Sequence, residues 1–264
     1  IFLDDVPRQP ILPPGFPSSW GGTAADYQMD PDIVSDPRYA GMMREALLSI
    51  PTMSLVMMQN DLFSVTAGIY ANSQNRGVAW ERPCSVELLR PDGEKGFQVN
   101  CGVRIQGGYF RSPGACRKHS FRLLFKSSYG PATLKYPLFG DDAGDEFDTI
   151  TLRAGANDGY TWNSARGTEQ YTRDEFARSL QRDAGQPASR GDFVHLYVNG
   201  LYWGLYNPCE RPDASFSATY CGGQKEDWDV FTHKGFALQQ GNRAALDQMT
   251  SVCRTAAGSY DAFQ

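Results

Sequence analysis

Alternating hydrophobic and polar positions run through the middle of the chain, and they predict β-strands. In the stretch KHSFRLLFK, Phe121, Leu123 and Phe125 fall on one face of an extended chain, while Arg122 and Lys126 fall on the other. The same pattern predicts strands in TMSLVMM, GIYAN, CSVELLR, FQVNCGVRIQGG and FDTITLRAG. Turn residues connect these runs, so the sequence predicts an antiparallel sheet of hairpins or a meander.

A tight hairpin is predicted between FVHLYV and LYWGLY, which are separated only by Asn199-Gly200. Asn-Gly accepts the left-handed backbone of a type I′ turn. Because Gly204 has no side chain, it predicts a point where another group packs closely against the strand. The aromatic residues are explained mainly as core and cross-strand contacts, with a carbohydrate-binding surface as the alternative: Tyr197, Tyr202, Trp203 and Tyr206.

Helical spacing is confined to a few segments. In DEFARSLQRDAG, Phe176 and Leu180 are predicted to form the buried stripe, with Thr172 and Glu175 as a capping box. A short helix is expected from Asp36, a second in RPDASFSATYCGG and a third in NRAALDQMTSVCRTA, whereas DWDVFTHKG is expected as a strand. Residues 1–50 are rich in proline and are predicted as an extended segment with one short helix. The chain is therefore predicted to be α+β.

Composition and charge narrow the class of protein. The net charge is −5, which argues against a nucleic-acid binder, and no apolar run approaches the roughly 18 residues of a membrane span. The six cysteines lack zinc-site spacing and are even in number, so we expect an exported protein with one to three disulfides. Cys84 and Cys101 could face each other, and Cys209 and Cys221 flank a short helix. Buried free thiols in a cytosolic protein are the alternative.

Common catalytic signatures are absent, but cations and carboxylates recur together at the predicted strand ends. Lysine and arginine neutralise phosphate oxygens, and carboxylates hold a metal or orient the cations, so this layout suits a nucleotide with Mg²⁺. Ordinary surface ion pairs are the alternative interpretation. The residues of this layout are Lys118, Arg122, Arg153, Asp158, Arg173, Asp174, Glu210 and Asp213.

Five blocks of sequence, in this order, resemble the CotH kinase-like family. They are KHSFRLLFKSSYGPATLKYPLF, FDTITLRAGAND, RDEFARSL, VHLYVNGLYWGLYNPCERPDASF and DWDVFTHKG, and the resemblance runs from about Gly102 to Gly235. It implies an atypical protein-kinase-like fold, with a β-rich N-lobe and a helical C-lobe that bind ATP and Mg²⁺ between them. It also implies a bacterial, extracellular or cell-surface protein that phosphorylates serine or threonine of exported proteins and carries neighbouring domains.

The resemblance also implies roles for individual residues. Lys118 is expected to contact a phosphate, and Glu210 to lie near the adenine or ribose. The remaining candidates are expected beside the phosphates or in an ion-pair scaffold that could hold a metal: Arg122, Arg153, Asp158, Arg173 and Asp213. The expected division is 1–50 for the N-terminal segment, 51–210 for the N-lobe, and 211–264 for the lobe connector and the start of the C-lobe.

The carboxylates that act as catalytic base and main metal ligand in this family are expected further along than Gln264. We therefore expect a C-terminally truncated domain that binds nucleotide but is nearly inactive, because phosphoryl transfer depends on metal neutralisation of charge. The alternative is a non-catalytic structural or adhesive domain with the same fold.

Overall fold

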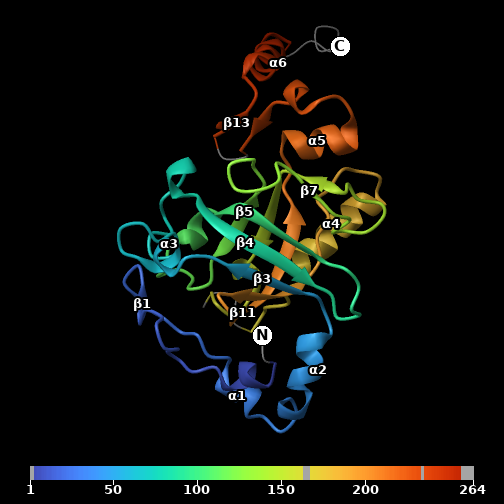
Figure 1. The fold of residues 1–264 in the computed structure, drawn as a ribbon. Helices are drawn as coiled ribbons and strands as arrows, with labels where there is room; N and C mark the ends of the chain where they lie inside the picture. Colours follow the sequence, from blue (N-terminus) through green and yellow to red (C-terminus); the bar gives the residue numbers. More distant parts are fainter. Residues whose placement is uncertain (1–2, 163–166, 233–234, 257–264) are drawn as a thin grey trace. The chain divides into compact units, whose positions relative to one another are not determined.

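The strands of the central sheet curl round until its two edges meet, which makes a closed barrel (Figure 1). The computed structural model describes residues 3–162, 167–232 and 235–256. Around the barrel the order is β10-β11-β9-β6-β5-β4-β3. The bounds are β3 (Thr52–Val56), β4 (Arg82–Leu89), β5 (Phe97–Gln106), β6 (Ser120–Leu124), β9 (Thr149–Arg153), β10 (Val194–Val198) and β11 (Leu201–Glu210).

Neighbouring strands pair in the antiparallel sense except at the closing seam, where β10 runs parallel to β3 with His195 opposite Thr52 and Val198 opposite Leu55. The barrel is filled by the inward-facing residues of each strand, among them Phe121, Leu123, Ile150 and Leu152, all fully buried. The α+β class is confirmed. The closure into a barrel was not foreseen, because the seam joins segments far apart in the sequence.

The Asn199-Gly200 hairpin is confirmed. Both residues have positive φ, 49° and 84°, as a type I′ turn requires. The Asn199 side-chain oxygen also accepts a hydrogen bond from the Met57 amide at 2.9 Å, so the turn is tied to the segment after β3.

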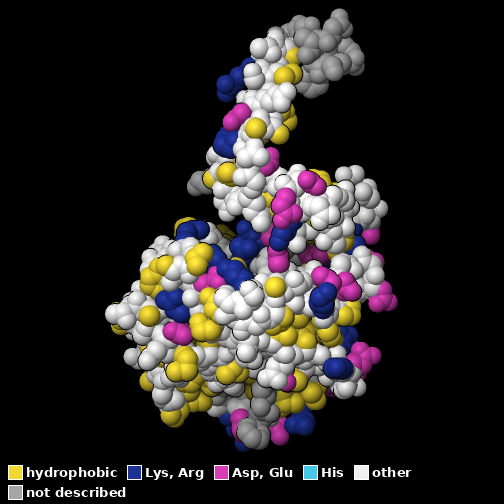
Figure 2. All heavy atoms as spheres, turned by 45° about the horizontal axis from the view of Figure 1, so that its top comes forward, with side chains coloured by type: hydrophobic (Ala, Val, Ile, Leu, Met, Phe, Trp, Pro, Cys, Tyr) yellow, Lys and Arg dark blue, Asp and Glu magenta, His cyan; other side chains and the backbone are white. Residues whose placement is uncertain are grey.

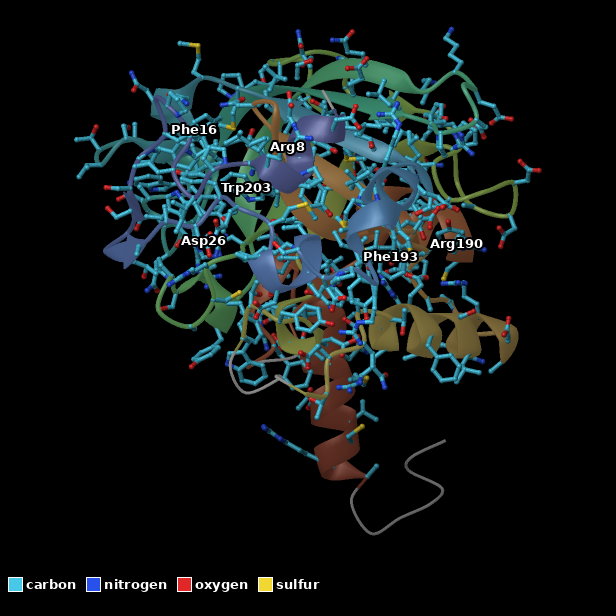
Figure 3. All side chains as sticks on the ribbon, turned by 90° about the horizontal axis from the view of Figure 1, so that it is seen from below. Arg8, Phe16, Asp26, Arg190, Phe193 and Trp203 are labelled. Atoms are coloured by element: carbon cyan, nitrogen blue, oxygen red, sulfur yellow. The ribbon has the colours of Figure 1, made fainter. Side chains whose placement is uncertain are left out.

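The N-terminal segment packs onto the barrel and contributes to its core. It contains η1 (Leu3–Arg8), β1 (Ser19–Trp20), β2 (Thr23–Ala24), α1 (Pro31–Val34), η2 (Ala40–Met42) and α2 (Met43–Leu48). Trp20 and Tyr27 are buried, and Phe16 and Trp203, both labelled in Figure 3, each contact the Tyr27 ring, with centroids at 5.3 and 5.8 Å. The helix expected from Asp36 starts later, because the Asp36 carboxylate binds the Arg38 amide and guanidinium.

Two further local predictions are wrong for tertiary reasons. GIYAN forms a turn after α3 (Gln59–Phe63), where the Ile69 and Tyr70 amides bond to carbonyls of Asp61 and Leu62 and both side chains are buried. In α4 (Arg173–Asp183), Phe176 and Leu180 are 65% and 52% exposed.

The face that α4 turns to the barrel is polar. Arg178 donates to the side-chain oxygen of Asn207 on β11 at 2.6 Å and to Glu175 at 2.7 Å. Buried polar groups need partners, and this network supplies them, so the ionic face of α4 is directed inward and the apolar stripe outward.

The expectation of disulfides is not met. The cysteines all carry free thiols, and four of them are buried. Cys84 and Cys101 do face each other in register across β4 and β5, with 3.4 Å between their sulfur atoms. Cys209 is buried on β11, and Cys221 is exposed at the end of α5 (Ala214–Cys221).

The chain divides into two compact units, Ile1–Glu210 and Arg211–Gln264. The first unit also contains η3 (Val78–Trp80), η4 (Tyr109–Arg111), β7 (Leu134–Lys135), β8 (Glu146–Phe147) and η5 (Ala156–Asp158). The second contains α5, η7 (Lys225–Asp227), β12 (Val230–Phe231), β13 (Leu238–Gln240) and α6 (Ala244–Thr255). The strand expected in DWDVFTHKG is limited to β12, and its residues 233–234 lie outside the described residues. None of the described helices is both long and apolar enough to cross a membrane.

Replacing Gly200 by alanine should lower the free energy of unfolding by about 1–2 kcal/mol, because a Cβ disfavours its left-handed backbone. Gly41 is a matched control, since its φ is not positive and an added Cβ would meet no atom within 4 Å. Gly41→Ala should change stability by less than about 0.5 kcal/mol in the same urea titration. Equal effects of the two substitutions would contradict the turn assignment.

Candidate functional site

Lys118 lies just before β6, and its side chain runs across β11. Its Nζ donates a hydrogen bond to the carbonyl of Leu205 at 2.6 Å and lies 4.4 Å from the centroid of the Tyr206 ring and 5.9 Å from that of Tyr171. A Cβ on Gly204 would lie only 2.9 Å from Nζ. Gly204 therefore allows a close approach to the strand, as predicted, and the group that packs against it is the Lys118 ammonium.

Burial lowers the pKa of Lys118 to about 7, and the nearby Cys116 thiol acts weakly in the opposite direction. Among the described residues, no carboxylate comes within 4.0 Å of its Nζ to form an ion pair. The cations that bind Glu81 differ in this respect. Lys126 and Arg104 both bind the buried carboxylate of Glu81, at 2.8 and 2.5 Å.

Tyr171, one of the two rings beside Lys118, has an unusual backbone. Its φ is 63°, a left-handed value that a bulky residue rarely adopts. The hydroxyl accepts a hydrogen bond from the Tyr160 amide at 3.1 Å. Gly155 and Gly159 lie against the ring, and a Cβ on Gly159 would come within 2.8 Å of the hydroxyl. Strained backbone held by its surroundings is common at functional sites, so this loop belongs to the candidate site.

Asp158 holds the loop before α4 in place. Its buried carboxylate accepts hydrogen bonds from the amides of Gln170 at 3.1 Å and Arg173 at 3.3 Å, and the Arg173 guanidinium lies 3.4 Å away. Arg173 is the first residue of α4, so Asp158 satisfies an amide of the first turn from a distance. The predicted capping box is wrong for this reason: Thr172 makes no side-chain cap.

Arg122 and Arg153 lie on the other side of the sheet from Tyr206. Each alternates along its strand with a buried core residue, Leu123 and Leu152 respectively. Arg122 donates to the hydroxyl of Thr149 at 2.8 Å, and Arg153 forms an ion pair with Asp174 of α4. The structure therefore places these two arginines on the outer face of the barrel, whereas the Lys118 amine lies against the core ring of Tyr206.

Glu210 and Asp213 both hold backbone amides. Glu210 is buried at the end of β11 and accepts from the Arg190 amide at 2.8 Å. Asp213 caps α5 by accepting from the amides of Ser215 and Phe216 at 3.1 and 3.3 Å. In the described part of the chain, no group of three or more His, Cys, Asp or Glu residues is arranged to hold a metal. Asp158 accepts amide hydrogens through both carboxylate oxygens and Asp213 through Oδ1, so the contacts of both carboxylates are with the backbone and neighbouring arginines.

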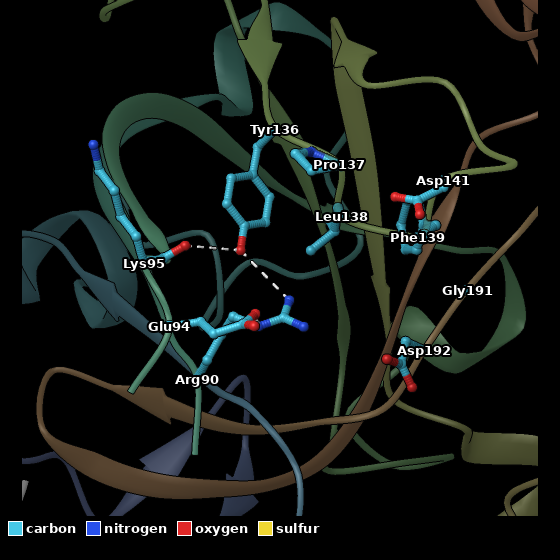
Figure 4. Close-up of a pocket in the computed structure, with 11 residues that line it drawn as sticks. Arg90, Glu94, Lys95, Tyr136, Pro137, Leu138, Phe139, Asp141, Gly191 and Asp192 are labelled. Carbon is cyan, nitrogen blue, oxygen red and sulfur yellow. Dashed lines mark hydrogen bonds and ion pairs between the residues drawn. The ribbon is translucent and has the colours of Figure 1, made fainter. Parts of the chain in front are cut away.

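A separate cavity of about 720 Å³ lies beside the turn after β4 (Figure 4). The Tyr136 hydroxyl donates to the Lys95 carbonyl at 3.1 Å and accepts from Arg90 at 3.4 Å. The Arg90 guanidinium also pairs with Glu94 at 3.3 Å, so this cation is already neutralised. The cavity contains none of the predicted site residues.

Tyr171 and Cys116 were not predicted as neighbours of Lys118, nor was Thr161 predicted beside Cys116. Cys116 is buried, and its sulfur donates to the Lys118 carbonyl at 3.0 Å and lies 3.1 Å from the Thr161 hydroxyl. The two glycines of LRAGANDG, Gly155 and Gly159, were the one available signal, since close approach by a ring needs such residues. The left-handed conformation of Tyr171 has no signature in the sequence.

Asp158→Asn should lower the free energy of unfolding by about 1–3 kcal/mol, because it places an amide donor against backbone amides in a buried position. Asp142→Asn is the control, since the Asp142 side chain is 79% exposed and forms a surface ion pair with Arg190. It should cost less than about 0.5 kcal/mol by urea unfolding. Equal losses would show that Asp158 does not hold the loop.

The stability advantage of Lys118→Met over the wild type should shrink as pH rises from 6 to 8.5. The folded-state pKa of Lys118, about 7, lies below its unfolded value, so the unfolded state binds more protons above pH 7 and the wild type gains stability there. Lys135→Met is the control, because pairing with Glu146 raises the pKa of Lys135. Urea titrations at each pH measure the difference, and a pH-independent difference would contradict the assigned environment.

Comparison with known proteins places the chain in a family. The family described as CotH kinase protein matches residues 103–261, which is more than half of the chain and includes Lys118, the Tyr171 loop and β11. A search of curated proteins finds no match. The chain therefore belongs to the CotH kinase protein family.

Proposed function

We propose that this chain binds ATP through Lys118, as the nucleotide-binding part of an exported kinase that phosphorylates serine or threonine of other proteins. Family membership supports a kinase-like domain. The observation that carries the proposal is the Lys118 ammonium, which hydrogen-bonds to the Leu205 carbonyl and has no carboxylate partner among the described residues. Kinase-type sites use such a lysine to neutralise phosphate charge.

The environment of Lys118 suits a phosphate for electrostatic reasons. A phosphate oxygen would restore the full positive charge of an amine that burial makes partly neutral. The contact would be strong because the tyrosine rings keep the local dielectric low. No existing ion pair has to break, in contrast to Lys126 or Lys135.

The other predicted residues take supporting roles in this proposal. Arg153 and Arg173 pair with Asp174 and Asp158, which fix the start of α4 relative to the sheet. Arg122 is assigned to the outer face of the barrel. The placement of Glu210 near the adenine or ribose remains a prediction. A metal role for Asp158 and Asp213 remains a prediction, since each belongs to no described group of three or more His, Cys, Asp or Glu residues arranged to hold a metal.

A non-catalytic, exported interaction domain is the second candidate. The observation that favours it is the apolar stripe of α4, where Phe176 and Leu180 are 65% and 52% exposed. On the face shown in Figure 2, hydrophobic side chains lie among cationic and acidic ones with no large patch of one charge, which suits contact with another protein better than with nucleic acid. Extracellular or cell-surface location, protein substrates and neighbouring domains are part of both candidates.

Addition of ATP should raise the melting temperature of the chain, and Lys118→Glu should abolish that rise while leaving the protein folded. Lys135→Glu is the matched control, because Lys135 is an exposed lysine in an ion pair on β7. The shift is measured by scanning calorimetry with and without Mg²⁺, and circular dichroism checks the fold of each variant. Retention of the shift in Lys118→Glu, or its absence in the wild type, would contradict the proposal and favour the interaction domain.

A further inference from the structure

Among the lysines whose contacts the structure describes, Lys118 differs in what holds its amine. Lys126 and Lys135 point Nζ at carboxylates, Glu81 at 2.8 Å and Glu146 at 2.5 Å. Lys118 points Nζ at a backbone carbonyl between two tyrosine rings. A carboxylate favours the protonated amine, whereas a carbonyl accepts one N–H and leaves a neutral amine with its lone pair available.

We infer that Lys118, a half-buried residue, is a site of covalent acylation by small acyl phosphates, because its amine is hydrogen-bonded to the Leu205 carbonyl, lined by the rings of Tyr171 and Tyr206, and unpaired with any described carboxylate. A lysine in a hydrophobic pocket is the usual form of an activated amine nucleophile. The inference concerns the residue named in the proposed function but does not require that nucleotide binds.

The groups around Nζ do not strongly favour the protonated form of the Lys118 amine. The titratable side chains that face it are Cys116 from the loop before β6, Tyr171 from the loop before α4, and Tyr206 from β11. Burial raises the pKa of both tyrosines, so they are uncharged at neutral pH. With its own pKa lowered to about 7, roughly half of the Lys118 amine is neutral at pH 7, compared with roughly four parts in ten thousand of an ordinary lysine.

The reaction balances without an oxidant or reductant. The lone pair of Nζ attacks the carbonyl carbon of the acyl phosphate, an N–C bond forms, and the bond between that carbon and the phosphate oxygen breaks. Inorganic phosphate leaves with the electron pair, and the amine loses a proton to solvent. The product is an uncharged amide that keeps one N–H for the Leu205 carbonyl. Acylation therefore removes the positive charge from the site.

The test is to incubate the full chain with acetyl phosphate at pH 7 and to measure acetylation at each lysine by peptide mass spectrometry. Lys118 should be acetylated at least about ten-fold faster than Lys126 or Lys135, which is less than the difference in neutral amine because a less basic amine is also less nucleophilic. Labelling of Lys118 should level off above about pH 8, whereas labelling of Lys135 should keep rising, since its pKa is raised.

Two controls make the result decisive. In urea the preference for Lys118 should disappear, because the fold causes it, and Lys118→Arg should lose that acetylated peptide alone. Equal rates at Lys118 and Lys135 in the folded chain, or a preference that persists in urea, would overturn the inference. ATP separates the two proposals: selective acetylation that ATP does not slow supports the acylation site and contradicts nucleotide binding, whereas protection by ATP supports both.

Discussion

The parallel pairing of β10 with β3 is the contact on which the rest of the structure depends. It joins Thr52–Val56 to Val194–Val198 and so turns an open antiparallel sheet into a barrel. Closure removes both free edges, which would otherwise expose unpaired backbone groups. On the other side of β10, β11 pairs with β10 through Leu201–Tyr206 and with β9 through Asn207–Glu210, and so links these two strands. Because β11 carries Gly204, Tyr206 and Asn207, its place in the barrel sets the contacts of Lys118 and of α4.

The two faces of β11 make different contacts, and a β-bulge determines which residue lies on which face. Leu196 pairs with Gly204 and Tyr197 with Tyr202, so Trp203 is the extra residue of the bulge. Its ring packs against Trp20 and Tyr70, with centroids at 5.7 and 5.4 Å. Beyond the bulge, Tyr206 faces the core and Lys118, while Asn207 faces Arg178 of α4. A shift of one residue would exchange these faces, so the bulge and the glycine together determine where the amine can lie.

The sequence predicted correctly the features that depend on residues close to one another in the chain. Strict alternation identified β4, β5, β6 and β9, and Asn199-Gly200 identified the hairpin, because period and turn chemistry are local. The failures at α4 involve distant partners. Asp158 replaces the cap expected from Thr172, and Asn207 draws the polar face of α4 inward, so that Phe176 is exposed. The sequence made Lys118 a candidate site residue, but its neighbours Tyr171 and Leu205 come from other elements and leave no signal near it in the sequence.

Deviations from ordinary structural rules gather around Lys118, and this concentration is the physical reason to assign function there. Carboxylates elsewhere in the barrel and its loops have partners: Glu81 binds Arg104 and Lys126, and Asp158 binds two amides and Arg173. At Lys118, by contrast, a buried amine lacks a described counter-ion, a tyrosine has left-handed backbone, and a glycine interrupts a strand. Desolvating the ammonium opposes folding, and the Leu205 carbonyl offsets only part of that cost. An anionic ligand or a neutralising modification would remove the remainder, so both proposals for this site follow from the same unbalanced charge.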